Sequence, residues 1–135
     1  MRYETDKHGT CASTVYNGTN GFLDYWEAAL NTLDRYDLLS ALKKKGITPS
    51  DSTLYQESDI KAAIQSVVGA KVNIHCATDD SKVLSEVRIC LKRPTNAAER
   101  KNPVPFDCPR TETSCSTKGI YLREIPNLES GGCEF

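Results

Sequence analysis

Six cysteines in a chain of 135 residues constrain this sequence more than any other feature. The cytosol keeps thiols reduced, so this density of cysteine indicates disulfide bonds and an oxidising compartment. A zinc site is the alternative, but zinc favours close pairs such as Cys-x-x-Cys, and the closest pair here is Cys108 and Cys115. We therefore predict disulfides rather than a metal site.

Length and charge limit the remaining possibilities. The chain is long enough for one domain, and its formal net charge of -1 and pI of about 6.1 give no basic face for a nucleic acid. Any contact with RNA must therefore be local. No apolar stretch approaches the roughly 20 residues of a membrane span, so we expect no membrane association.

The first residues, MRYETDKHG, lack the apolar region of a secretion signal. Because the cysteines indicate secretion, or the lumen of the vacuole or another endomembrane compartment, we expect residues to be missing before Met1. The glycosylation sequon at Asn17 agrees with a secretory route.

The apolar pattern predicts three helices after a surface loop at residues 12–21. The first begins at Phe22, with one apolar face made of Phe22, Trp26, Ala29, Leu30 and Leu33. A short second helix has Asp37 as its N-cap and ends at Gly46. Lysines 43–45 in its last turn suit the helix dipole, and we favour a solvated helix end over an RNA patch. The third helix begins at Ser58 and ends at Gly69. Its buried face consists of Ile60, Ala63, Ile64, Val67 and Val68.

The second half of the chain predicts strands. Apolar residues alternate from Val72 to Cys76 and again from Val87 to Leu91, with a turn near residues 78–81. Residues 94–109 contain four prolines and read as a long loop, and residues 120–125 as a last strand. Helices followed by antiparallel strands predict an α+β fold, with helices packed on a small sheet stapled by disulfides.

Reactive side chains concentrate at residues 3–11. In a helix, Glu4 and His8 share one face, and Lys7 is a neighbour of Glu4. A carboxylate, an ammonium and an imidazole suit RNA cleavage by transesterification, which needs proton transfer and stabilisation of charge on the phosphoryl group. A charged, solvated first helical turn is the alternative. His75, the only other histidine, falls in a predicted strand opposite Ile74, and we interpret it as a surface or rim residue.

The run Tyr-Glu-x-x-Lys-His-Gly-Thr-Cys at residues 3–11 resembles the second active-site segment of the ribonuclease T2 family, usually His-Glu-Trp-x-Lys-His-Gly-Thr-Cys. Residues 25–30, 36–42 and 58–64 are similar to the helices that follow it. The order of the cysteines from Cys76 to Cys115 is similar to that of plant members. The resemblance implies a truncated form of the ribonuclease T2 fold, with residues 1–135 as a single partial domain.

The resemblance also implies the site residues. His8 is the proton-transfer residue, Glu4 and Lys7 assist at the phosphorane, and Tyr3 stands where many members have a histidine that contacts the phosphate. The substrate is single-stranded RNA, the product is a 2′,3′-cyclic phosphate, and the resemblance implies that no metal or cofactor is used. We expect a monomer.

The cysteine pattern of the family implies nested disulfides, Cys90 with Cys108 inside Cys76 with Cys115. The two predicted strands also place Cys76 and Cys90 on neighbouring strands. The remaining Cys11 and Cys133 either pair with each other or stay free, and we favour the second, because nothing directs the tail towards Cys11.

Two departures from the family set up competing functions. Thr5 replaces a usual tryptophan, and the segment Phe-x-x-His-Gly-Leu-Trp-Pro, which carries the first catalytic histidine, does not occur in these 135 residues. The chain is therefore either part of a secreted endoribonuclease or a catalytically inactive remnant that binds RNA or a protein. The retained Glu4, Lys7 and His8 favour the first hypothesis.

Overall fold

The computed structural model describes residues 10–109 and 114–124, with only the backbone at residues 10 and 11. Its elements, in chain order, are η2 (Thr10–Thr14), α2 (Gly21–Arg35), α3 (Leu38–Lys44), α4 (Glu57–Val68), β1 (Asn73–Cys76), β2 (Leu84–Arg88) and α5 (Ala97–Lys101). The helices and the two-stranded antiparallel sheet have the α+β character that the sequence predicts.

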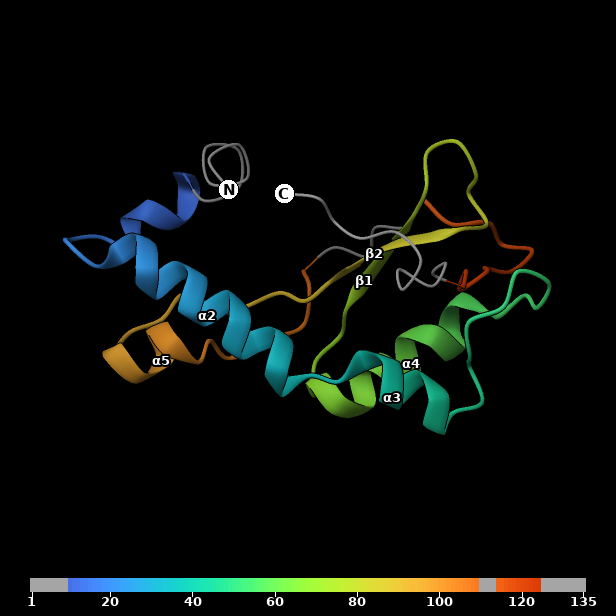
Figure 1. The fold of residues 1–135 in the computed structure, drawn as a ribbon, viewed down its shortest axis with the longest axis horizontal. Helices are drawn as coiled ribbons and strands as arrows, with labels where there is room; N and C mark the ends of the chain where they lie inside the picture. The colour runs from blue at the N-terminus through green and yellow to red at the C-terminus, as the bar shows by residue number, and fades with distance from the viewer. Residues whose placement is uncertain (1–9, 110–113, 125–135) are drawn as a thin grey trace, which may run out of the picture.

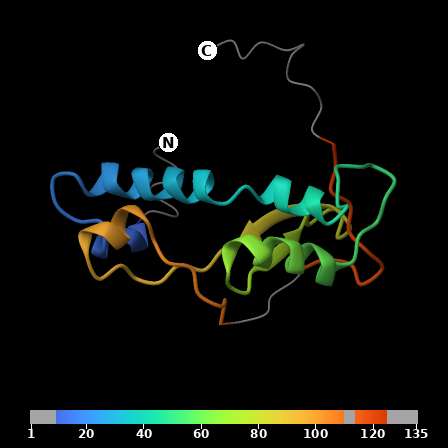
Figure 2. The ribbon, with the colours of Figure 1, turned by 90° about the horizontal axis from the view of Figure 1, so that it is seen from below.

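The molecule is elongated, as Figures 1 and 2 show. In Figure 2, α2 and α3 follow one another along one side of the molecule. Beneath α2 lie α5 and η2, and beneath α3 lie α4 and the sheet. The two consecutive helices α2 and α3 therefore connect the two ends of the elongated molecule.

The buried core lies at the end that contains α3, α4 and the sheet. The face of α4 made of Ile60, Ala63 and Ile64 is completely buried, together with Ile74 of β1 and Ile120 near the end of the described chain. These residues recur at helical and strand spacing, so burial follows the predicted periods. The prediction was wrong for Val67, which is partly exposed at the edge of the helix.

The local signals in the sequence set the helix ends. The Asp37 side chain accepts a hydrogen bond from the Ser40 N–H (2.9 Å), which satisfies a free donor of the first turn of α3. At the other end, Gly46 adopts a φ of 74°, a left-handed conformation that other residues avoid. Both features confirm the predicted second helix.

The sheet contains an irregularity. β1 pairs with β2 from Asn73 opposite Arg88 to His75 opposite Glu86, and then Cys76 lies opposite Leu84. Ser85 is thus an extra residue in β2, which is a β-bulge. The shift lets β2 continue towards an isolated bridge between Val83 and Tyr121.

Four further predictions were incomplete or wrong. Residues 12–14 belong to the 3-10 helix η2 rather than to a loop, and the proline-rich stretch contains α5, which Asn96 caps through the Glu99 N–H. The second strand ends at Arg88, three residues before Leu91. Around Ile120 and Tyr121 the structure has two isolated bridges instead of a continuous strand.

The predicted apolar face of α2 is largely exposed. Phe22, Leu30 and Leu33 are 51%, 59% and 72% exposed, whereas Gly21 and Ala28 are the buried positions of this helix. The helix therefore presents its large apolar side chains to solvent within the described part of the chain.

Two disulfides close the carboxyl-terminal half. Cys76 is bonded to Cys115 and Cys90 to Cys108, the nested pairing that the resemblance implied. The outer bond lies in the core, since Cys76 is buried and Cys115 packs against the core cluster. The side chains of Cys11 and Cys133 lie outside the described residues.

Candidate functional site

The segment predicted to carry the chemistry lies outside the described residues. It contains Tyr3, Glu4, Lys7 and His8, so their mutual geometry stays a prediction. The backbone becomes described at Thr10, the first residue of η2, two positions after His8. In sequence, η2 is therefore the described element nearest to the predicted catalytic segment.

Directly after this segment, η2 and α2 border a cavity of about 370 Å³. Its walls are mostly apolar and include Val15, Tyr16 and Tyr25 on one side and Leu91 and Pro103 on the other. The two tyrosine rings meet edge to face with their centroids 5.7 Å apart.

Tyr16 connects this region to α5. Its hydroxyl donates a hydrogen bond to the Arg100 carbonyl (2.9 Å), and burial, followed by the nearby Tyr25, raises the pKa of the Tyr16 hydroxyl. The hydroxyl therefore stays protonated at physiological pH and supplies no charge. Its hydrogen bond holds the loop between η2 and α2 against α5. No local pattern predicts this contact, because the partners are 84 positions apart in the sequence.

A second cavity of about 310 Å³ continues from the first along α2. The two cavities share Ala29 and Thr32, and the second is bounded by Tyr36 on the helix side and by Val87 and Ile89 on the strand side. Together they form one apolar groove between α2 on one side and β2 with the segment that follows it, to residue 94, on the other.

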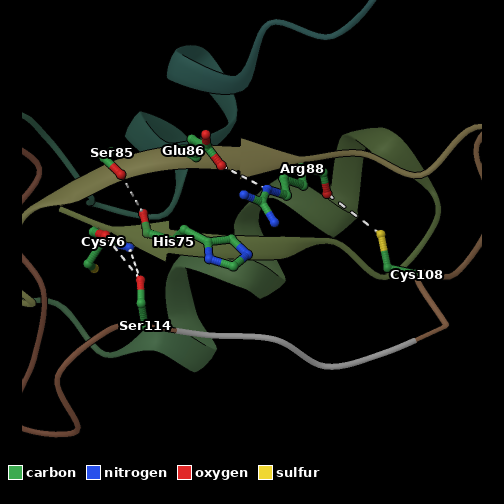
Figure 3. Close-up of polar contacts among 7 residues, drawn as sticks. All are labelled: His75, Cys76, Ser85, Glu86, Arg88, Cys108 and Ser114. Atoms are coloured by element: carbon green, nitrogen blue, oxygen red, sulfur yellow. Dashed lines mark hydrogen bonds and ion pairs between the residues drawn. The ribbon is translucent and has the colours of Figure 1, made fainter. Parts of the chain in front are cut away.

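A polar hollow of about 440 Å³ lies on the sheet around His75. Figure 3 shows His75 and Arg88 on the two strands, with Ser114 beside β1. Arg88 forms an ion pair with Glu86 (2.7 Å), and the Ser114 hydroxyl bridges the backbone N–H and C=O of Cys76 (2.9 and 3.0 Å).

His75 itself is partly exposed on the face opposite the buried Ile74, as the alternation predicts. Its Nε2 atom is buried and has no hydrogen-bond partner among the described residues. Three charged or polar side chains thus meet at this hollow, but the ion pair already neutralises Arg88, so the hollow is a weaker candidate for binding a phosphate than the predicted segment.

The remaining predicted surface features are exposed. Asn17 lies in the loop between η2 and α2, where a sugar has access to its amide. Lysines 43–45 are exposed at the end of α3, as expected for a solvated helix end. Among the described residues, no helix is long and apolar enough to cross a membrane. The same part of the chain brings no three His, Cys, Asp or Glu side chains together around a possible metal ion.

Comparison with known proteins identifies the fold. Residues 1–108 match the model of the ribonuclease T2 family. Ribonuclease Oy of Magallana gigas is 30% identical over 116 residues, which are 82% of this chain and 54% of that protein. Ribonuclease S-7 of Nicotiana alata is 31% identical over 125 residues, which are 93% of this chain and 51% of that protein. The chain therefore spans about half the length of these curated relatives.

Solved structures give the same answer. Trichomaglin, described as a novel S-like ribonuclease, superimposes with a TM-score of 0.67 at 30% identity, over 89% of this chain and 51% of that one. RNase NT, solved in complex with 5′-AMP, superimposes with a TM-score of 0.64 at 28% identity, over 86% and 52% of the two chains. The sequence, the helices, the sheet and the disulfides all agree, and the chain belongs to the ribonuclease T2 family.

Proposed function

We propose that this chain supplies one half of the active site of an endoribonuclease that cleaves single-stranded RNA to 2′,3′-cyclic phosphate ends. The family match carries the proposal, because it covers residues 1–108 and so includes the segment with Glu4, Lys7 and His8. We propose further that residues 1–135 form a single partial domain of this family.

Each residue of the segment has a role in the proposed reaction. The ribose 2′-hydroxyl loses a proton as its oxygen attacks phosphorus, and the departing 5′-oxygen gains one. His8 is suited to one of these transfers, because imidazole titrates near neutral pH. Lys7 offsets the charge that develops on the phosphoryl oxygens, and Glu4 assists it. Tyr3 donates a hydrogen bond to the phosphate.

The reaction as proposed uses no metal and no cofactor. Its substrate is single-stranded RNA, and RNase NT, a relative in structure, binds the nucleotide 5′-AMP. We propose a monomer that is secreted or held in a vacuolar or endomembrane lumen and glycosylated at Asn17. The two disulfides and the exposure of Asn17 support this location.

A catalytically inactive RNA- or protein-binding module is the second candidate. One observation favours it: the Phe-x-x-His-Gly-Leu-Trp-Pro segment, which brings the other proton-transfer histidine in the family, does not occur in the 135 residues. The two candidates differ in whether the chain becomes active when that segment is supplied.

The test is to fuse the part of trichomaglin that this chain does not match to the amino terminus of the full chain. Cleavage of polyuridine near pH 5 is then followed by the formation of cyclic phosphate ends. We expect His8→Ala to reduce cleavage by about 10²–10⁴-fold. His75→Ala is the matched control, because it removes the only other histidine, and it should leave the rate unchanged. A fused protein that is inactive, or in which His8→Ala keeps full activity, would refute the proposal.

A further inference from the structure

Polar contacts attach the short helix α5 to the rest of the molecule. None of its described residues is buried, so its position depends on these contacts. The Tyr16 hydroxyl donates a hydrogen bond to the Arg100 carbonyl (2.9 Å). The Asn31 side-chain amide donates to the Lys101 carbonyl (2.8 Å), and the Lys101 ammonium pairs with Glu27 of α2 (3.1 Å). In Figure 2, α5 accordingly lies beneath α2 and beside η2.

Two of these contacts use carbonyls that a helix leaves free. The last four carbonyls of an α-helix have no partner within the helix, and Arg100 and Lys101 are the last two residues of α5. The side chains of Tyr16 and Asn31 supply the missing donors. Because a hydrogen bond weakens steeply away from its preferred distance and angle, the end of α5 restricts where Tyr16 can lie.

The loop that carries α5 is closed at its base. The Lys92 N–H donates to the Val104 carbonyl (2.8 Å), and the Phe106 N–H donates to the Cys90 carbonyl (2.9 Å). The disulfide between Cys90 and Cys108 joins the same two ends of the loop. The support that α5 gives to Tyr16 is therefore tied to the carboxyl-terminal half of the chain.

Tyr16 is also bonded back to η2. Its backbone N–H donates to the Ala12 carbonyl (2.8 Å), and the Val15 N–H donates to the same carbonyl (2.9 Å). η2 begins at Thr10, two residues after His8, and two residues of chain span at most about 7 Å. A displacement of η2 therefore also displaces the point from which the chain leads to His8.

We propose that Tyr16 is a positioning residue for RNA cleavage: its bond to α5 holds η2, and η2 holds His8 where it transfers a proton. The inference rests on the proposed function, which assigns the proton transfer to His8. Accurate placement matters in catalysis, since a misplacement of about 1 Å can cost about 10²-fold in rate. Burial raises the pKa of the Tyr16 hydroxyl, so the donor proton of this bond is present at acidic and neutral pH.

Tyr55 provides a matched control. It is half-buried like Tyr16, and its hydroxyl also donates to a backbone carbonyl, that of Thr48, at 2.9 Å. The Thr48 N–H donates to the Tyr55 hydroxyl as well (3.2 Å), so Tyr55→Phe removes at least as many hydrogen bonds as Tyr16→Phe. Tyr55 lies between α3 and α4, and its hydroxyl bonds have no partner in η2 or α5.

The experiment measures kcat and KM of the same fused protein with polyuridine near pH 5. Tyr16→Phe should lower kcat at least about tenfold and leave KM within about twofold, because the substrate still binds while His8 is misplaced. Tyr55→Phe should leave both constants within about twofold. The double variant Tyr16→Phe/His8→Ala should cleave as fast as His8→Ala, because Tyr16 acts only through His8. A purely structural role would lower both rates by the same factor.

Hydrogen exchange tests the anchoring without cleavage. In the chain alone, Tyr16→Phe should accelerate exchange of the Val15 amide at least about tenfold, because η2 loses its support, and Tyr55→Phe should not. Unchanged exchange at Val15, an unchanged kcat in Tyr16→Phe, or additive effects in the double variant would each overturn the inference. A fused protein that is inactive, or in which His8→Ala keeps full activity, would instead refute the proposed function, and the positioning role with it. The two failures are therefore distinguishable.

Discussion

Opening the two disulfides one at a time tests the nested arrangement quantitatively. Cys76 and Cys115 are 39 positions apart, and Cys90 and Cys108 are 18 apart and lie between them. Because one loop encloses the other, the chain entropy removed by each bond depends on whether the other is closed.

The chain-entropy estimate gives the expected order. With the inner bond intact, the outer bond closes a loop of about 21 residues (39 less 18) and stabilises the fold by about 3.3 kcal/mol. With the outer bond intact, the inner bond divides a closed ring of 39 residues into arms of 18 and about 21 residues. Two arms that join the same two points act together as a loop of about 10 residues, so the inner bond stabilises the fold by about 2.6 kcal/mol. Loss of the outer bond should therefore cost more, by about 0.7 kcal/mol from entropy alone.

Packing increases the difference. Cys76 is buried within the core, whereas Cys90 and Cys108 are half-buried, so removal of the outer bond also disturbs core contacts. Either loss is a substantial fraction of the roughly 5–15 kcal/mol by which domains are usually stable.

The measurement is urea unfolding of the paired variants Cys76→Ala/Cys115→Ala and Cys90→Ala/Cys108→Ala, followed by far-UV circular dichroism. The free energies of unfolding are compared at a common slope, since a change in slope would indicate an altered denatured state. A greater loss for the inner pair would contradict the nested loops and the core position of the outer bond.

Three further outcomes follow from the described part of the chain. Ile64→Ala should cost about 2–5 kcal/mol in urea unfolding, because the side chain is fully buried, whereas the mostly exposed Leu30→Ala should cost less than about 0.5 kcal/mol; equal costs would contradict the observed core. Gly119→Ala should lower the melting temperature, because its φ is 117° and a Cβ would come within 2.9 Å of a leucine side chain; an unchanged value would refute the conformation. Hydrogen bonds from Ser40 lower the pKa of Asp37, and hydrogen bonds from Thr95 lower the pKa of Glu99. These ionised carboxylates therefore stabilise the folded state above the ordinary carboxyl pKa, and this stabilisation is lost as the pH falls through the lowered value. Asp37→Asn should make the melting temperature less dependent on pH in this acidic range, and an unaltered dependence would show that the carboxylate charge has no role.

Local signals made much of the fold predictable. The Asp37 cap, the glycines that end α3 and α4, and the spacing of Ile60 and Ile64 each depend on nearby residues in the sequence. Such features follow from backbone geometry and hydrogen bonding within a few positions, so a single sequence is enough to locate them.

The predictions that were wrong depend on distant contacts. The helical spacing of α2 predicted one apolar face, but periodicity does not say which surface covers that face, and its large side chains are exposed. The strand around Ile120 became two isolated bridges, because its partners, Tyr55 and Val83, come from different parts of the chain. The bulge at Ser85 shows the same limit, since strand register is set by pairing.

The candidate site likewise has one part that the sequence predicted and one part that only the structure shows. Residue types at 3–11 suggested the chemistry and the family, and the family match includes that segment. The groove between α2 and β2 had no signal in the sequence, because its walls come from residues about 60 positions apart and become adjacent only in the fold.

The rate of RNA cleavage by the chain alone tests the central claim most directly. Purified chain is incubated with polyuridine near pH 5, and cyclic phosphate ends are counted against a full-length relative such as ribonuclease S-7 of Nicotiana alata. If the chain carries one of two proton-transfer groups, its turnover should be lower by about 10²–10⁴-fold, since each such group typically contributes that factor. Turnover equal to that of the full-length enzyme would contradict the account, because the residues of this chain would then form a complete active site.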